Sequence, residues 1–132
     1  MDNQKHTVMV VEDEELLLQA ITKKLKFVGI DVVSCLSGKQ AIDYLNNLPT
    51  LPDAIWLDYY LKDMNGLEFM QTIKKNPNWQ KIPVLVVSNS ASTDKVNHML
   101  ALGVSKYLLK AEYRLDQIID IVKQLMKEGG EG

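Results

Sequence analysis

Polar side chains stand at the points where short apolar runs of the sequence end, and their types suit phosphate and metal chemistry. These side chains are Glu12 and Asp13 after the run 7–11, Asp58 after 54–57, Ser88 after 84–87, and Lys110 at the end of 106–110. Three carboxylates in one place would repel one another and take up protons unless a cation relieved them. An all-oxygen ligand set suits Mg²⁺. The ammonium and the hydroxyl would suit a phosphoryl group on Asp58, because such chemistry depends mostly on positioning and electrostatics.

Apolar runs alternate with amphipathic stretches along the chain, which predicts five strands and five helices. The predicted strands are 7–11, 31–36, 54–57, 84–87 and 106–110. The predicted helices are one ending at Gly29, one over 37–48, one beginning at Asn65, one over 92–103 and one over 114–127. Ser37 with Gln40, and Asn65 with Glu68, have the spacing of helix-capping pairs.

This alternation predicts an α/β fold, a flavodoxin-like (βα)5 three-layer sandwich. Right-handed crossovers build a parallel sheet with helices on both faces. In the strand order 2-1-3-4-5 the topological switch point lies between the first and third strands, and ligands bind outside the carboxyl ends there. We therefore expect the polar strand-end side chains to converge on one pocket.

Size and composition narrow the function classes. The chain has 132 residues, 46% of them hydrophobic, as expected for one domain with a real core. A net charge of −2 argues against nucleic acid or an anionic membrane as the main partner. The apolar runs are too short to span a bilayer, and the N-terminus lacks the apolar core of a signal peptide. Cys35 is the only cysteine, so no internal disulfide forms, and we expect a cytoplasmic protein.

With these residues in order, the chain resembles a response-regulator receiver domain of two-component signalling, similar to the stand-alone chemotaxis-type receivers. The matching motifs are Val10-Val11-Glu12-Asp13, Asp58 with Gly66 eight residues on, Val86-Val87-Ser88 and Lys106-Tyr107-Leu108-Leu109-Lys110. Each motif is weak alone, but their order and spacing together are specific. The resemblance covers about residues 7–127, with 1–6 as an N-terminal tail and 128–132 as a flexible C-terminal tail.

The resemblance implies a site for phosphoryl transfer. Asp58 would be the phosphoacceptor, and Mg²⁺ would be the cofactor. Asp13 would bind the ion directly and Glu12 mostly through water, with the Tyr60 backbone carbonyl as a further ligand. Lys110 would pair with Asp58 and then with the phosphoryl oxygens. The protein would thus change its own phosphorylation at Asp58 only and would be no enzyme in the ordinary sense.

The resemblance also implies a switch and partners. Ser88 would contact the phosphoryl group, and Tyr107 matches the aromatic switch position three residues before the lysine. The face formed by helix 92–103, strand 106–110 and helix 114–127 would then change shape for a protein effector. The phosphodonor would be a histidine kinase or a phosphotransfer protein, and the chain would be a monomer or weak dimer. No output domain fits within 132 residues, so we expect the effector to be a separate protein or a domain missing from this chain.

Three positions depart from the family pattern. Lys62 stands four residues after Asp58, where the family usually has proline, and Asn89 follows Ser88, where small residues are common. Ala111 replaces the proline that usually follows the lysine on a cis bond. A cis bond to alanine costs about 3 kcal/mol, so we expect either a trans bond or a strained cis bond.

Three other functions fit parts of the pattern. A pseudo-receiver that binds partners without phosphorylation is consistent with Lys62, Asn89 and Ala111. A phosphohydrolase of the haloacid dehalogenase type needs a second aspartate two residues after the nucleophile, and that position is Tyr60. A flavodoxin needs a donor-rich phosphate loop after the first strand, where the acidic run 12–15 would repel phosphate.

Overall fold

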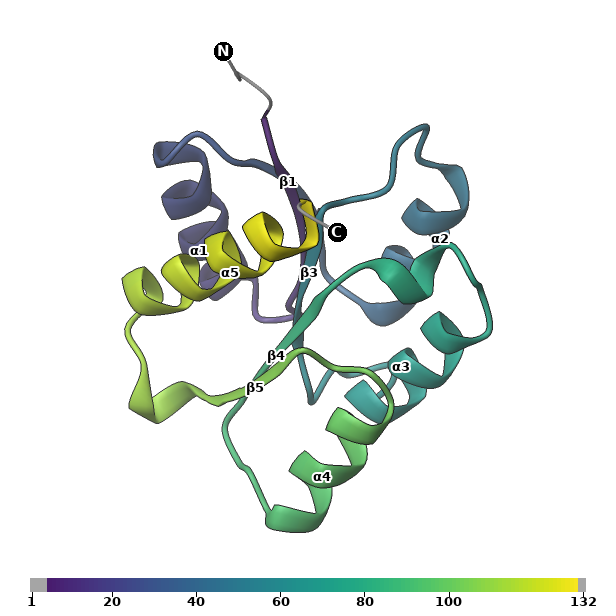
Figure 1. Ribbon diagram of the computed structural model, residues 1–132. Helices are drawn as coiled ribbons and strands as arrows, with labels where there is room; N and C mark the ends of the chain where they lie inside the picture. The colour runs from purple at the N-terminus through teal and green to yellow at the C-terminus, as the bar shows by residue number, and fades with distance from the viewer. Residues whose placement is uncertain (1–4, 131–132) are drawn as a thin grey trace.

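A computed structural model describes residues 5–130 and shows one five-stranded parallel sheet (Figure 1). Its strands are β1 (Thr7–Val11), β2 (Asp31–Cys35), β3 (Ala54–Asp58), β4 (Val84–Ser88) and β5 (Lys106–Leu109). They lie in the order β2-β1-β3-β4-β5, and every neighbouring pair is parallel. The predicted α/β fold and strand order are therefore confirmed.

Five helices cover the sheet in two layers. They are α1 (Glu15–Phe27), α2 (Gly38–Asn47), α3 (Gly66–Lys74), α4 (Thr93–Ala101) and α5 (Leu115–Gly130). Figure 1 shows α1 and α5 on one face of the sheet and α2, α3 and α4 on the other. Each layer encloses its own apolar core, because alternate residues of a strand point to opposite faces. In β1, Val8 and Val10 join the core under α1 and α5, while Met9 and Val11 join the other.

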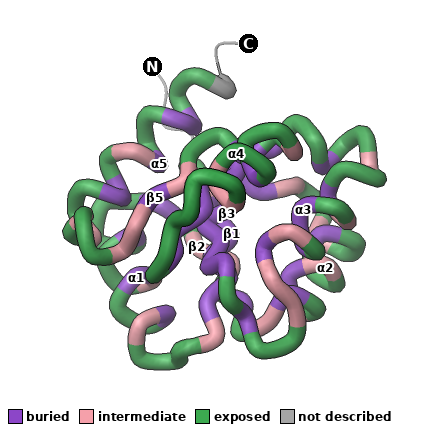
Figure 2. The backbone as a smooth tube through the Cα atoms, turned by 90° about the horizontal axis from the view of Figure 1, so that it is seen from below, coloured by how far each residue is buried: buried purple, intermediate pink, exposed green. Residues whose placement is uncertain are grey.

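The central strands are buried along their whole length, as the purple segments of Figure 2 show. All five residues of β3 and all five of β4 are buried, including the polar residues at their carboxyl ends. Continuous apolar runs are what a parallel sheet covered on both faces requires. The fold thus carries Asp58 and Ser88 to the end of two neighbouring buried strands.

Local signals explain where the helices begin and end. Asn65 and Glu68 form a reciprocal capping box at the start of α3. Ser37 accepts the Gln40 N–H at the start of α2, but the Gln40 side chain accepts from the Leu36 N–H instead of from the cap residue. Gly29 and Gly103, with φ of 85° and 100°, follow the last turns of α1 and α4, as predicted.

Some boundaries differ from those predicted. β5 ends at Leu109, because Lys110 begins a short 3₁₀ turn, η2 (Lys110–Glu112). A second turn, η1 (Trp79–Lys81), lies within the predicted loop before β4. Helix α5 continues to Gly130, so the tail predicted to begin at residue 128 begins inside a helix. Residues 1–4 and 131–132 lie outside the described part of the chain.

Two further findings concern the described residues alone. Between residues 5 and 130 there is no cis peptide bond, so the bond from Lys110 to Ala111 is trans. None of the helices in this range has the length and apolar character needed to cross a membrane.

Candidate functional site

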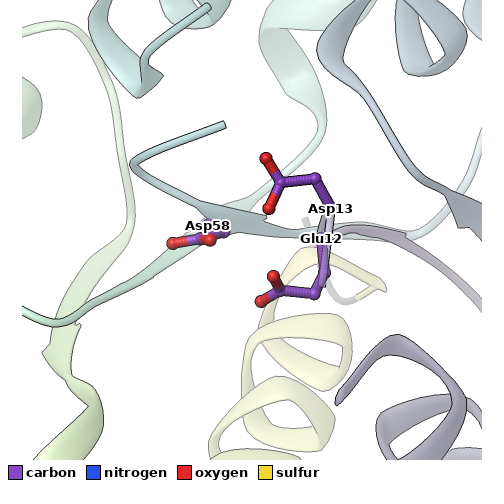
Figure 3. A group of neighbouring side chains, drawn as sticks. All are labelled: Glu12, Asp13 and Asp58. Carbon is purple, nitrogen blue, oxygen red and sulfur yellow. The ribbon is translucent and has the colours of Figure 1, made fainter. Parts of the chain in front are cut away.

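Three carboxylates meet where β1 and β3 end, as Figure 3 shows. One oxygen each of Glu12, Asp13 and Asp58 lies within 4.8 Å of the other two. Glu12 and Asp58 are buried and Asp13 is half-buried. The parallel pairing of β1 with β3 causes this convergence, because Val11 stands opposite Leu57 and the next residues of both strands emerge together.

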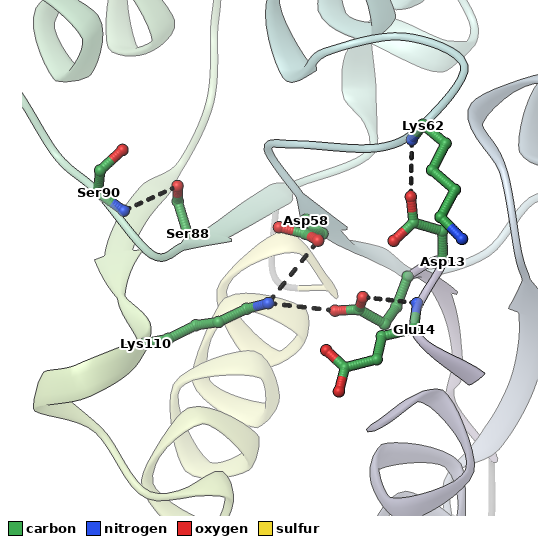
Figure 4. A network of polar contacts seen from close by, with 8 residues as sticks. Asp13, Glu14, Asp58, Lys62, Ser88, Ser90 and Lys110 are labelled. Carbon is green, nitrogen blue, oxygen red and sulfur yellow. Dashed lines mark hydrogen bonds and ion pairs between the residues drawn. The ribbon is translucent and has the colours of Figure 1, made fainter. Parts of the chain in front are cut away.

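Lys110 approaches this acidic cluster from the end of β5 (Figure 4). Its Nζ lies 3.4 Å from Glu12 Oε1 and 3.7 Å from Asp58 Oδ2. A second contact orients Glu12, whose other oxygen accepts the Glu14 N–H at 3.0 Å. The trans bond after Lys110 therefore leaves the ammonium within reach of both buried carboxylates.

One ammonium does not balance three carboxylates, and the imbalance appears in the protonation of Asp58. Burial raises the pKa of Asp58 to about 7, and the neighbouring charges of Glu12 and Asp13 act in the same direction. Lys110 opposes them but does not cancel them. Without another cation, the site therefore holds its central carboxylate partly protonated near neutral pH.

This ligand set fits a divalent cation. Carboxylate oxygens are the ligands that Mg²⁺ prefers, and the half-exposed Asp13 leaves the site open to water and ligands. A dication would also supply the positive charge whose lack raises the pKa of Asp58. The donor chemistry and the charge balance of these residues are thus compatible with Mg²⁺.

The loop between β3 and α3 (residues 59–65) is anchored to its surroundings at several points. The Lys62 N–H donates to Asp13 Oδ2 at 2.6 Å, a bond that a proline at this position could not form. Asp63 accepts the N–H groups of Gly38 and Lys39 at 3.0 and 2.9 Å, and so caps α2 from outside that helix. Met64 packs so closely on Gly38 that a Cβ there would lie 2.5 Å from its sulfur.

Ser88 and Tyr107 lie on the β4 and β5 side of Asp58, away from β1 and the acidic residues that follow it. Ser88 is fully buried at the end of β4, and its Oγ accepts the Ser90 N–H at 3.3 Å (Figure 4). Tyr107 is half-buried, and its hydroxyl donates to the Ser90 carbonyl at 2.9 Å. Burial raises the pKa of Tyr107. Asn89 is exposed.

The structure brings most of the predicted site residues together around Asp58. Glu12, Asp13, Asp58 and Lys110 form one compact cluster, and Ser88 ends the strand beside Asp58. Tyr60 follows Asp58 by two residues, and the role predicted for its backbone carbonyl stays a prediction. Its side chain reaches the β4–α4 loop, where its hydroxyl lies 3.2 Å from Ser90 Oγ.

Sequence reasoning missed several residues that hold the site. Asp63 carried one usable signal, since it stands in a turn-forming stretch where a carboxylate can cap a nearby helix. The contact of the Lys62 N–H and the contacts of Ser90 carried none, because backbone groups and exposed loop hydroxyls have no sequence pattern.

Comparison of the sequence with known proteins identifies relatives of this chain. The response regulator receiver domain family matches residues 8–123. The chain is 32% identical to the signal transduction histidine-protein kinase BarA of Escherichia coli over 115 residues, which is 86% of this chain and 12% of that protein. It is 28% identical to the two-component response regulator ORR5 of rice, covering 78% of this chain and 76% of that protein. The chain spans under a fifth of the length of the first curated relatives that it matches, RcaC and BarA.

Solved structures show the same architecture. The phosphorylated cyanobacterial phytochrome response regulator RcpA is 31% identical, with a TM-score of 0.78 over 92% of this chain and 91% of that one. A CheY-like receiver domain protein from Methanospirillum hungatei has a TM-score of 0.87 at 19% identity, covering 97% of this chain and 98% of that one, which shows the shared fold. The family match over almost the whole chain decides the assignment: this chain belongs to the response regulator receiver domain family of two-component signalling.

Proposed function

We propose that Asp58 accepts a phosphoryl group from the phosphohistidine of a histidine kinase or phosphotransfer protein. The observation that carries this proposal is the meeting of Glu12, Asp13 and Asp58 within 4.8 Å, with the Lys110 ammonium beside two of them. An Asp58 oxygen attacks phosphorus, the phosphorus–nitrogen bond breaks, and its electron pair stays on the imidazole of the donor. The phosphorylated state of RcpA, a relative of similar fold, supports this chemistry.

The residues divide the work of the transfer. Glu12, Asp13, Asp58 and the Tyr60 carbonyl would hold Mg²⁺, which when bound offsets the charge of the carboxylates and of the incoming phosphoryl oxygens. Lys110, already 3.7 Å from Asp58, supplies a second positive charge. The Ser88 hydroxyl donates a hydrogen bond to the phosphoryl group.

Signal output follows from the position of Ser88. A phosphoryl group adds charge and acceptor oxygens at Asp58, which draws the Ser88 hydroxyl toward it. Ser88 is bonded to Ser90, and Ser90 is bonded to Tyr107, so displacement of Ser88 moves the loop that anchors Tyr107. The face formed by α4, β5 and α5 changes shape and binds the effector protein.

Intact-mass measurement tests the transfer. Treatment with acetyl phosphate and Mg²⁺ should add one phosphoryl mass to the wild-type chain, and chelation of Mg²⁺ should prevent it. Asp58→Asn should remove the added mass, while Asp120→Asn, an exposed aspartate on α5, should leave it intact. Labelling that persists in Asp58→Asn would refute the assignment. Absence of labelling in the wild type would favour a phosphorylation-independent interaction module.

Two further measurements test the metal and the switch. Asp13→Asn should weaken Mg²⁺ binding in calorimetric titration, because it removes one charged oxygen. Beryllofluoride, which stands in for the aspartyl phosphate, should shift NMR signals of residues 89–110 more than those of α2. A response confined to the neighbours of Asp58 would show that the α4–β5–α5 face carries no signal.

A further inference from the structure

Ser90 is an exposed serine in the loop between β4 and α4, yet all of its polar groups are engaged. Its N–H donates to Ser88 Oγ, and its carbonyl accepts from the Tyr107 hydroxyl. Its own hydroxyl lies 3.2 Å from Tyr60 Oη and 3.5 Å from Lys95 Nζ. One exposed residue thus connects the end of β4, strand β5, the loop after β3 and the first turn of α4.

Lys95 holds this arrangement from the side of α4. Its ammonium lies 4.8 Å from the centroid of the Tyr59 ring and 4.5 Å from that of Tyr60, and it donates to Tyr60 Oη. The two rings meet edge to face, with centroids 4.8 Å apart. Within residues 5–130 Lys95 forms no ion pair, so the rings and the hydroxyls are the partners of its charge.

Helix α4 depends on such contacts more than α1 and α3 do. Met99 is its one buried residue, whereas α3 buries four residues and α1 buries three. An element with little buried apolar surface moves at low cost in free energy. The contacts of Lys95 therefore contribute much of the free energy that holds the first turn of α4 against the loop after β3.

We propose that Lys95 is a positioning residue that clamps Tyr60 and Ser90 together and so holds Ser88 and Tyr107 in the pose they take without a phosphoryl group. This inference rests on the proposed function, because it concerns the displacement of Ser88 toward a phosphorylated Asp58. That displacement stretches the bond from the Ser90 N–H and pulls Ser90 away from Lys95 and Tyr60. The clamp stabilises the unswitched conformation and so sets how much phosphorylation is needed to populate the switched one.

Loss of the clamp should shift the conformational population toward the switched state. A ligand that requires the switched state binds more tightly when contacts made only in the other state are removed. Lys95→Met removes the charge and keeps an unbranched apolar side chain. In the wild type, the cation over the aromatic rings stabilises the unswitched state. Because Lys95→Met removes this stabilisation at a partly exposed site, its affinity for beryllofluoride with Mg²⁺ should rise about two- to fivefold.

Beryllofluoride titrations followed by NMR test the proposal, with Lys123→Met as the matched control, since Lys123 is exposed on α5. Lys95→Met should tighten binding and Lys123→Met should not. Lys95→Arg, which keeps a cation over the rings, should restore wild-type affinity. Lys95→Met combined with Tyr60→Ala should bind no more tightly than the tighter single variant, because both act through one clamp. Equal or weaker binding by Lys95→Met, or effects that multiply in the double variant, would overturn the clamp.

A second measurement separates this inference from the proposed function. In the metal-free protein, hydrogen exchange of the Ser90 amide should be faster in Lys95→Met than in Lys123→Met, because the bond to Ser88 loosens. Unchanged exchange refutes the clamp whether or not Asp58 accepts a phosphoryl group. Failure of beryllofluoride to bind any variant refutes the phosphoacceptor assignment, and with it the role of the clamp in switching.

Discussion

The loop after β3 is held in different ways on its two sides. Toward α2, Asp63 accepts two backbone N–H groups, Met64 packs against Gly38, and the Lys62 N–H is bonded to Asp13. Toward α4, the contacts run between the partly exposed side chains of Tyr60 and Lys95 and the loop residue Ser90. We call these the α2 side and the α4 side.

The difference bears on the direction in which the proposed signal would leave Asp58. Backbone bonds and tight packing on the α2 side resist displacement, because closely packed groups lose contacts when they separate. Side-chain contacts on the α4 side are individually weak and exchange with water. A change at Asp58 is therefore expected to move the α4 side, where the free-energy cost of displacement is lower.

The largest expected contrast is in thiol reactivity. Cys35 ends β2, is fully buried, and has a pKa raised by burial to about 12, so it should react only through unfolding. A thiol at the exposed position 89, introduced as Asn89→Cys, should react at least about a thousand times faster with a disulfide reagent. Comparable rates for the two thiols would show that the apolar core packed against α2 opens as readily as the β4–α4 loop.

The pH dependence of stability tests the raised pKa of Asp58, the carboxylate that precedes the loop after β3. The folded pKa of Asp58 is about 7 and lies above the ordinary value of 3.8, so the folded state binds the proton more tightly. In metal-free protein, the free energy of unfolding should therefore rise by about 1–3 kcal/mol as pH falls from 8 to 5. Urea titrations should show that Asp58→Asn removes this rise. A rise that survives in Asp58→Asn would have to come from other groups.

Removal of the Asp63 carboxylate breaks the α2 side directly. Asp63→Ala leaves two N–H groups of α2 without their acceptor and should lower the free energy of unfolding by about 1–2 kcal/mol. The control is Asp94→Ala, an exposed aspartate in the first turn of α4, which should cost under about 0.5 kcal/mol. Urea denaturation measures both. Equal costs would contradict the inequality of the two sides.

The smallest effect is expected from a matched pair of helix caps. Ser37 Oγ accepts the Gln40 N–H at the start of α2, and Ser92 Oγ accepts the Lys95 N–H at the start of α4. Ser37→Ala should cost about 1 kcal/mol of global stability, and Ser92→Ala about half of that or less. Ser92→Ala should instead speed hydrogen exchange within α4. If Ser37→Ala speeded exchange within α2 more than Ser92→Ala speeded exchange within α4, the α2 side would be the more easily displaced of the two.

The sequence predicted the parts of the site that follow from strand order. Once β1, β3 and β4 are recognised as parallel neighbours, Glu12, Asp58 and Ser88 must emerge at one edge of the sheet. The strand limits were predicted to within a residue, because the apolar runs mark the buried strands, although burial continues to the polar Asp58 and Ser88. The end of α5 was placed too early, since Glu128 and the glycines after it resemble a loop in composition.

The contacts around the site were beyond sequence reasoning for a physical reason. Lys62 was expected only to be a departure from proline, whereas its N–H holds Asp13. Lys95 and Tyr60 are 35 residues apart, and nothing in the spacing indicates that an ammonium rests on that ring. Such contacts depend on side-chain rotamers and loop paths, which many distant residues decide together.

The anchoring of the loop after β3 also bears on which changes in chain length the fold tolerates. Residues 59–65 have fixed partners in the loop after β1, on α2 and at the start of α3, so an inserted residue would separate Asp63 from α2 or Lys62 from Asp13. The loop from 89 to 92 has exposed residues, and Ser90 makes its contacts outside the loop. An insertion there would disturb the contacts of Ser90 but would cost the fold less free energy, because α4 begins with its own cap at Ser92. Lineages of this chain should therefore vary in length before α4 and keep the length after β3 constant.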